Sequence, residues 1–174
     1  MEIDLNGRWP IALLGLLFVL SGCTDGNDPN MLSKRYGLLL DSRPEPVTTI
    51  GVAKEKIEQT DQVIVEGWLD LKAFESQNGK ALVMVREILD DQEHGGEGHD
   101  PSSCPFCKRR MDAAPKAAVV FVDEDEKTLP YSIGQLLPVE HGDIVVIQGT
   151  GKPSDDVIDL KIRATGVYLT KQDR

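Results

Sequence analysis

Residues 141–149 read HGDIVVIQG, and residues 160–164 read LKIRA. In the first stretch a Gly-Asp turn leads into an unbroken apolar run, whereas the second alternates between apolar and cationic side chains. Both patterns are typical of β-strands, and the polar residues between them are typical of a loop. We therefore predict strands at residues 143–148 and 160–164, the last with one apolar and one cationic face.

Three further strand-like runs precede this pair, with turn signals between them. They are residues 62–69 (QVIVEGWL), 81–89 (ALVMVREIL) and 117–122 (AAVVFV). Between the third and fourth runs, residues 131–137 (YSIGQLL) are a candidate for a short helix. Five strands with a helix in this place resemble the OB-fold, a five-stranded Greek-key barrel.

This resemblance implies a mainly β protein with a small five-stranded OB-like Greek-key barrel at residues 61–170. One short helix and a long loop insertion between strands 2 and 3 complete the expected domain. A β-sandwich or a different small barrel is the alternative, because a glycine-led strand is common to many small β folds. The resemblance is one of architecture and carries no function with it.

The charge of the chain bears on its partners. Its 174 residues include 19 Lys+Arg against 29 Asp+Glu, which gives a formal net charge of −10. Nucleic-acid binding draws most of its affinity from Lys and Arg set against phosphates. We find no local basic stripe that offsets this acidity, so we expect no nucleic-acid partner.

The N-terminus carries an export pattern. Residues 11–20 (IALLGLLFVL) form an apolar run that is too short to cross a membrane but fits the central region of a signal peptide. The sequence Leu20-Ser21-Gly22-Cys23 that follows resembles the lipobox of bacterial lipoproteins. In that family the signal is cleaved before the cysteine, which would make Cys23 the lipidation site. The alternative is a short buried helix with an ordinary cysteine.

The lipobox resemblance implies a division of the chain and a location. Residues 1–22 would be the signal peptide, and residues 23–60 would be a tether and linker to the barrel domain. The protein would be exported and held in the bacterial cell envelope by its lipid anchor. Thr24 follows Cys23 where an Asp retains some lipoproteins at the inner membrane, so the periplasmic side of the outer membrane is slightly favoured.

The insertion at residues 90–116 contains nearly all the soft metal ligands of the chain. They are His94, His99, Cys104 and Cys107, in the spacing H-x4-H-x4-C-x2-C. A Cys2His2 set fills the tetrahedral sphere that structural Zn²⁺ prefers, and Cu(I) is the main competitor. Because such a loop builds no core of its own, a bound metal would supply its folding energy. We therefore predict a metal site here, with zinc as the first candidate.

Two other interpretations of the cysteine pair stay open. In an oxidising compartment Cys104 and Cys107 could form a short disulfide in a solvated loop. The stretch Cys104-Pro105-Phe106-Cys107 also resembles the active site of glutaredoxins, which would make Cys104 a nucleophile activated by Lys108 and its neighbours. A thioredoxin-type fold, however, needs a strand leading into this motif and alternating strands and helices after it, and the sequence predicts neither.

The remaining candidates are weaker. Residues 123–126 (DEDE) are expected to form a solvated turn, and His141 is expected to be exposed beside its Gly-Asp turn. Trp68 is interpreted as a core or barrel-rim residue, although an oligosaccharide or oligonucleotide binder would expose an aromatic groove near it. The sequence has no recognisable catalytic constellation. We expect a binding or structural role with an unknown protein or small-molecule partner, and a thiol-disulfide oxidoreductase is the alternative.

Overall fold

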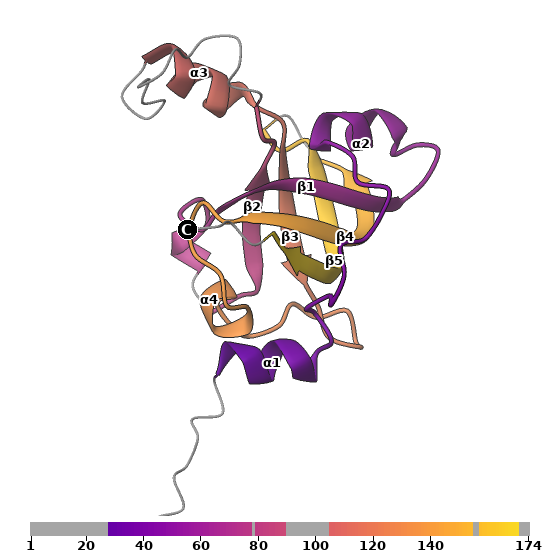
Figure 1. Cartoon of the computed structure of the whole chain (residues 1–174), viewed down its shortest axis with the longest axis vertical. Helices are drawn as coiled ribbons and strands as arrows, with labels where there is room; N and C mark the ends of the chain where they lie inside the picture. The colour runs from indigo at the N-terminus through magenta and orange to yellow at the C-terminus, as the bar shows by residue number, and fades with distance from the viewer. Residues whose placement is uncertain (1–27, 78, 90–104, 155–156, 171–174) are drawn as a thin grey trace, which may run out of the picture.

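The computed structural model describes residues 28–77, 79–89, 105–154 and 157–170, and these residues form a closed β-barrel (Figure 1). Around the barrel the strand order is β1-β2-β3-β5-β4. The strands are β1 (Gln62–Asp70), β2 (Leu82–Arg86), β3 (Lys116–Phe121), β4 (Ile144–Pro153) and β5 (Leu160–Leu169). β3 and β5 run parallel, and the other neighbouring pairs are antiparallel. This arrangement confirms the predicted small OB-like barrel.

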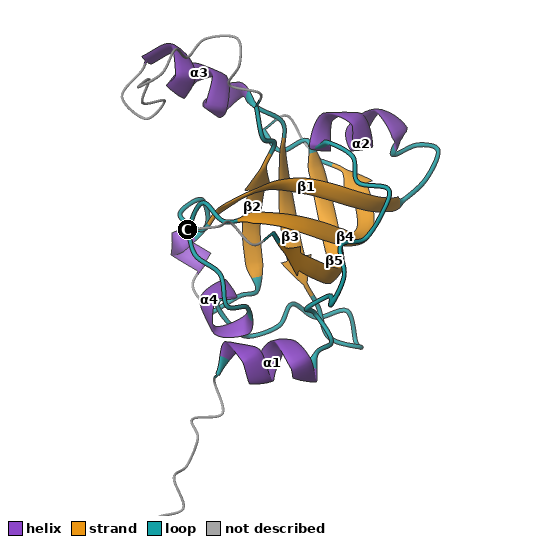
Figure 2. Ribbon diagram, viewed as in Figure 1, coloured by secondary structure: helices purple, strands orange, loops and turns teal. Residues whose placement is uncertain are grey.

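The helices lie around the barrel, as Figure 2 shows. They are α1 (Pro29–Arg35), α2 (Ile50–Lys56), α3 (Pro105–Ala113), α4 (Ile133–Leu136) and a single 3-10 turn, η1 (Glu75–Gln77). The helix predicted between the third and fourth strands is α4. The Gln135 side chain accepts a hydrogen bond from the backbone N–H of Ser132 at 3.0 Å, which fixes the start of that helix.

The last two strands are both longer than predicted, and β4 continues past residue 148, where the predicted strand ended, through Gly149 to Pro153. The register between β4 and β5 shifts at Gln148/Gly149, and pairing then continues as far as Pro153 and Leu160. A Cβ atom at Gly149 would lie 2.2 Å from the carbonyl oxygen of Arg163. Glycine therefore permits the close backbone approach that this irregularity requires.

The barrel interior holds the core. Along β1 the side chains of Val63, Val65 and Leu69 point inward and are buried, whereas Trp68 lies on the outer side and is half-buried. The largest fully buried side chains include Phe121 of β3 and Ile147 of β4. The alternation that predicted the strands therefore reflects side chains that point in turn into the barrel and toward its surface.

Residues 28–60, which were predicted as part of a tether and linker, pack against the barrel. Leu38 of this segment is 4% exposed and Ile50 is completely buried, and both belong to the core cluster. The backbone N–H of Leu40 donates to the carbonyl of Val167 at 2.9 Å, and that of Thr48 donates to Ile64 at 2.9 Å. The segment thus contributes both apolar side chains and backbone hydrogen bonds to the domain.

The register of the strands explains where this segment binds. β1 pairs with β2 only from Trp68 onward, so the first part of its edge on that side is left for Thr48. β5 pairs with β3 only as far as Ala164, which leaves Val167 for Leu39 and its neighbours. Unpaired strand edges invite association with other chains. The segment before β1 covers both of these edges.

An ion pair fastens α2 to the barrel. The Lys54 ammonium lies 2.8 Å from one carboxylate oxygen of Asp159, and the other oxygen accepts the backbone N–H of Lys116 at 2.8 Å. Burial by itself raises the pKa of Asp159, but the hydrogen bonds from Lys54 and Lys116 outweigh it, so the pKa lies below its ordinary 3.8. The ionised form of Asp159 therefore stabilises the contact between α2, β3 and the residue before β5.

The apolar run at residues 11–20 and Cys23 lie outside the described residues. Among the helices that the structure does describe, none has the length and apolar character needed to span a membrane.

Candidate functional site

The insertion between β2 and β3 leaves and re-enters the barrel at neighbouring positions. The two strands remain paired as far as Arg86 and Lys116, and the backbone N–H of Glu87 donates to the carbonyl of Pro115 at 2.9 Å. The base of the insertion is therefore closed by the sheet itself. In Figure 1 α3, which belongs to the insertion, lies beyond one end of the barrel.

Most of the predicted metal ligands fall outside the described residues. This holds for His94, His99 and Cys104, so the structure places none of them. Cys107 lies in the first turn of α3, but its side chain is also outside the described part. Within that part, no group of three or more His, Cys, Asp and Glu side chains could hold a metal ion. The Cys2His2 site stays a prediction.

The C-terminal end of α3 is attached to the barrel. The Arg86 guanidinium approaches the carbonyl of Met111 at 3.4 Å, and the Lys116 ammonium donates to the carbonyl of Asp112 at 3.1 Å. Cations are favourable at this end of a helix because its last carbonyls lack partners within the helix. Directly after the helix, Ala114 is buried. One end of α3 therefore has a fixed position on the barrel.

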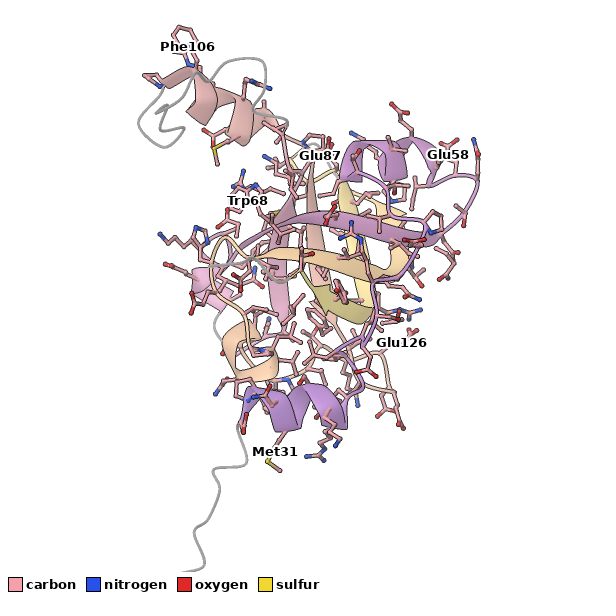
Figure 3. The ribbon with its side chains drawn as sticks, viewed as in Figure 1. Met31, Glu58, Trp68, Glu87, Phe106 and Glu126 are labelled. Atoms are coloured by element: carbon pink, nitrogen blue, oxygen red, sulfur yellow. The ribbon has the colours of Figure 1, made fainter. Side chains whose placement is uncertain are left out.

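Among the described residues, nothing holds the rest of α3 in this way. None of its described side chains is buried, and Phe106 is 75% exposed. Figure 3 shows Phe106 at the outer end of the helix, pointing away from the barrel. A helix of 9 residues is too short to be stable in water without packing or another restraint. We therefore expect a further restraint at its N-terminal end, where Cys104 and Cys107 lie.

A polar and aromatic cluster that the sequence did not predict lies beside this attachment. The Arg86 guanidinium lies 5.6 Å from the ring centroid of Trp68, and the ring of His141 meets Trp68 edge to face at 5.9 Å. Arg86 also forms an ion pair with the buried Asp70 at 2.9 Å. Trp68 thus lies at the rim of the barrel, flanked by the side chains of Arg86 and His141. The four residues of this cluster come from three separate parts of the sequence, namely β1, β2 and the loop before β4, so no motif indicated the cluster.

His141 has a structural partner in this cluster. Its Nδ1 accepts the backbone N–H of Leu71 at 3.2 Å, which requires a lone pair on that nitrogen. The same nitrogen lies 3.8 Å from a carboxylate oxygen of Asp70, and the histidine side chain is 39% exposed. The histidine is therefore partly exposed, as predicted, but it also fastens the loop before β4 to the end of β1.

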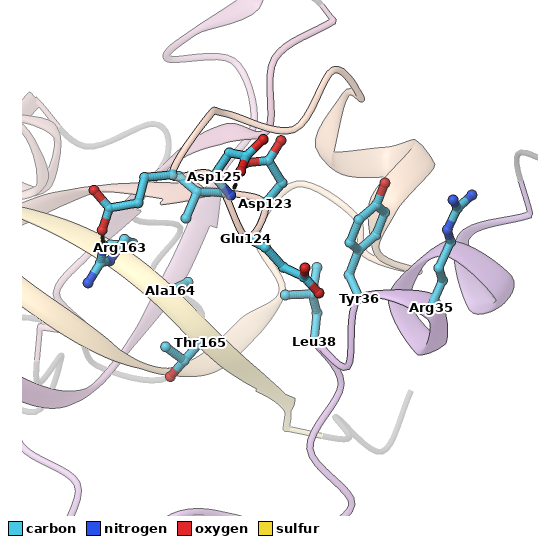
Figure 4. A pocket seen from close by; sticks show the side chains of 11 residues that line it. Arg35, Tyr36, Leu38, Asp123, Glu124, Asp125, Arg163, Ala164 and Thr165 are labelled. Atoms are coloured by element: carbon cyan, nitrogen blue, oxygen red, sulfur yellow. Dashed lines mark hydrogen bonds and ion pairs between the residues drawn. The ribbon is translucent and has the colours of Figure 1, made fainter.

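A cavity of about 770 Å³ lies between the end of α1, the turn at residues 123–126 and β5 (Figure 4). Three of the acidic residues of the turn, Asp123, Asp125 and Glu126, have partners within the protein. Asp123 accepts backbone N–H groups from Asp125 at 3.0 Å and from Lys127 at 2.9 Å, and Glu126 pairs with Arg163. The predicted solvated turn is therefore confirmed, and its charges stabilise the turn and attach it to β5.

Tyr36 borders the same cavity. Its hydrogen bond with Tyr131 raises its pKa above the ordinary 10.0, and burial of the hydroxyl adds to this effect. The two rings lie 6.1 Å apart in a tilted arrangement. Tyr36 therefore stays neutral at physiological pH and connects the end of α1 to the segment before α4.

Comparisons with known proteins add little about function. No family model and no curated protein matches the sequence. A solved structure described as an aspartyl-tRNA synthetase from Leishmania major Friedlin is similar with 10% sequence identity and a TM-score of 0.39. The match covers 76% of this chain and 22% of that one, so the chain spans less than a quarter of that protein. At this level the likeness carries no argument about function.

Proposed function

We propose that this protein is a lipid-anchored binding or structural module of the bacterial cell envelope, whose barrel carries a metal-stabilised insertion. Cys23 would hold the acyl chains. His94, His99, Cys104 and Cys107 would bind one transition metal ion, with zinc as the first candidate and copper as the second. The chemistry of this donor set supports a closed structural site rather than a catalytic one, because four protein ligands leave no open position.

The observation that carries the proposal is the unsupported outer end of α3. The helix begins at Pro105, directly after Cys104, and Cys107 lies in its first turn. Its C-terminal end is held by Arg86 and Lys116, whereas Phe106 projects into solvent. A metal bound by both cysteines would restrain the end that the barrel does not hold. Its binding energy would then appear as folding energy of the insertion.

Metal content and thiol count test this proposal on the same sample. The full chain, purified without a chelator, is expected to contain one zinc per chain and to release two reactive thiols from Cys104 and Cys107 on denaturation. His94→Ala/His99→Ala should lose the metal, because two of the four ligands are removed. The third histidine of the chain, His141, supplies the matched control, and His141→Ala should keep the metal. A metal-free protein with Cys104 and Cys107 joined as a disulfide would contradict the proposal.

A membrane-tethered thiol-disulfide oxidoreductase is the second candidate, and one observation favours it. Since α3 begins directly after Cys104, the free N–H groups at the helix start would lower the pKa of a thiol placed there. Oxidation of both thiols to a disulfide would pass two electrons and two protons to a disulfide substrate. The closed barrel is not the thioredoxin-type fold of the glutaredoxins, which makes this the weaker candidate.

The same variants separate the two candidates. An oxidoreductase would be isolated without metal and would cycle between dithiol and disulfide when a dithiol reductant and a disulfide substrate are supplied. Its rate would change little in His94→Ala/His99→Ala and would be lost in Cys104→Ser. For the metal module we expect a metal-bound chain whose cysteines show no turnover, and we expect the histidine variant to lose its metal.

A further inference from the structure

Among the described residues, the arginines of α3 lack the carboxylate partners that the strand arginines Arg86 and Arg163 have. In the barrel and the segment before it, Arg43 pairs with Glu66 at 2.8 Å, and Lys54 and Arg86 are paired as described above. No salt bridge between described residues includes Arg109 or Arg110. The sequence Lys108-Arg109-Arg110 is moreover a run of three cations in a chain with a net charge of −10. Of its arginines, Arg109 is exposed and Arg110 is half-buried, so α3 has a short positive patch rather than the longer basic stripe that nucleic-acid binding needs.

An exposed aromatic side chain lies on the same side of the helix. Phe106 is separated by three and four positions from Arg109 and Arg110, a spacing that places all three on one helix face. At 75% exposure it is the most exposed large apolar side chain among the described residues. Aromatic residues and arginine are enriched at the centres of protein interfaces. We refer to Phe106, Arg109 and Arg110 as the α3 face.

The position of the α3 face indicates where its partner would lie. α1 and α3 lie at opposite ends of the molecule, and the described chain begins at Asp28, directly before α1 (Figure 1). If Cys23 is acylated, four residues lie between it and Asp28, and the five Cα–Cα steps that join them reach at most about 17 Å. The lipid anchor would then hold the α1 end near its membrane. The α3 face would point away from that membrane.

We propose that the α3 face binds an acidic segment of a protein partner located on the side of the molecule away from the anchoring membrane. Carboxylates of the partner would pair with Arg109 and Arg110, and an apolar side chain would cover Phe106. The inference rests on the proposed function, because the orientation depends on acylation of Cys23. Opposite charges would also attract the partner to α3 in preference to the acidic barrel.

A membrane surface is a less suitable partner for the α3 face. Helices that lie on membranes bury a broad apolar side made of several large residues. Among the described side chains of α3, Phe106 is the only large apolar one that is exposed, and Met111 is half-buried. One aromatic residue beside two arginines fits an anchor in a protein interface better than a membrane-binding helix.

Peptide binding to the full chain tests this proposal. The chain is held by its anchor in nanodiscs of neutral phosphatidylcholine, and the probe is a fluorescent peptide of glutamates with a few interspersed leucines. A second peptide has glutamine in place of every glutamate. Fluorescence anisotropy at low salt should give a Kd about tenfold lower for the glutamate peptide, because its carboxylates pair with arginine. Raising the salt concentration should reduce this difference.

Charge reversal at the α3 face should remove this binding. Arg109→Glu/Arg110→Glu is expected to weaken it by about tenfold or more, and Phe106→Ser by severalfold. Lys80→Glu/Lys152→Glu changes the net charge by the same amount at exposed positions outside α3, so it should bind as the original chain does. Circular dichroism of every variant checks that the barrel is intact.

Three outcomes would overturn the proposal. They are equal binding of the glutamine peptide, unchanged binding by Arg109→Glu/Arg110→Glu, and binding to phosphatidylglycerol vesicles in place of the peptide. The metal content of each sample and the incorporation of the chain into nanodiscs are measured in parallel. Loss of metal or of anchoring with normal peptide binding would contradict the proposed function alone. Normal metal content and anchoring without peptide binding would contradict the α3 interface alone.

Discussion

Single glycines decide how closely the barrel strands can approach one another. A Cβ atom at Gly67 of β1 would lie 2.4 Å from the carbonyl oxygen of Arg86, and one at Gly149 would lie 2.2 Å from that of Arg163. In both cases the obstacle is backbone in a paired strand, which cannot rotate away as a side chain could. These positions therefore require glycine for the space it leaves.

Gly149→Ala is expected to destabilise the barrel. The added methyl group would force β4 and β5 apart at the register shift, at a cost of about 1–3 kcal/mol in the free energy of unfolding. Gly134 in α4 is the matched control, because a Cβ atom there meets nothing within 4 Å. Gly134→Ala should be neutral or slightly stabilising. Urea denaturation of both variants checks this, and equal stabilities would contradict the close approach seen at Gly149.

Asp159→Asn should reduce stability at neutral pH by about 1 kcal/mol, because Lys54 and the Lys116 amide lose a charged acceptor. The folded pKa of Asp159 lies below its ordinary 3.8, so this contribution is complete above that value and is lost as the pH falls through the folded pKa. Denaturation curves of the variant and the original chain should therefore converge at acid pH. Asp125 is exposed, so Asp125→Asn serves as the control. A difference in stability between Asp159→Asn and the original chain that persisted at acid pH would refute this account.

At the scale of elements, residues 28–60, which precede β1, are an integral part of the folded barrel domain. It covers the strand edges that the offset registers leave open, and it places Leu38 and Ile50 in the core. α2 is held in turn by Lys54 and Asp159, and by Glu87, whose carboxylate accepts the backbone N–H of Gly51 at 2.7 Å. Short helices such as α1 and α2 owe their stability to this packing rather than to their own propensity.

A chain that begins at residue 61 should fail to fold stably. Each large buried side chain that it lacks contributes about 2–5 kcal/mol, which is comparable with the whole stability of a small domain at about 5–15 kcal/mol. A chain that begins at residue 28 keeps all of these contacts and should unfold cooperatively. Thermal melts followed by circular dichroism distinguish the two. Similar melting temperatures would mean that residues 28–60 act only as a linker.

At the scale of the whole molecule, the barrel separates two ends that carry different elements. One end has α1 and the start of the described chain, and the other has the base of the insertion and α3 (Figure 1). The acidic net charge of the chain repels anionic polymers and so opposes nonspecific association with them. The basic α3 is the local exception.

Replacing Cys23 should release the protein from membranes. Two acyl chains give stable anchoring because each buried methylene contributes about 0.8 kcal/mol, and the Cys23→Ala variant cannot receive them. In cells that process lipoproteins, labelled palmitate should be incorporated into the original chain but not into Cys23→Ala. Cys107→Ala is the matched control and should be labelled normally. Failure to label the original chain would contradict the proposed anchor.

Much of the barrel could be predicted because strand formation depends on local patterns. The alternation around Val65 and the run around Ile147 mark the strands directly, since a strand places every second side chain on one face. The barrel architecture then followed from resemblance to the OB-fold, with the helix at residues 133–136 in its expected place. For the candidate site, the sequence predicted donor residues by chemical type alone. It placed no side chain in space.

The sequence by itself determined the five strands, the acidic charge and the cysteine and histidine spacing of the insertion. Only the tertiary structure decided that Trp68, Asp70, Arg86 and His141 meet, that residues 28–60 complete the barrel, and that α3 presents Phe106 to solvent. The physical reason is that local patterns reflect periods of a few residues, which recur along the chain. Contacts between distant segments depend on strand register and backbone clearance, as at Gly149, and these exist only once the barrel has closed.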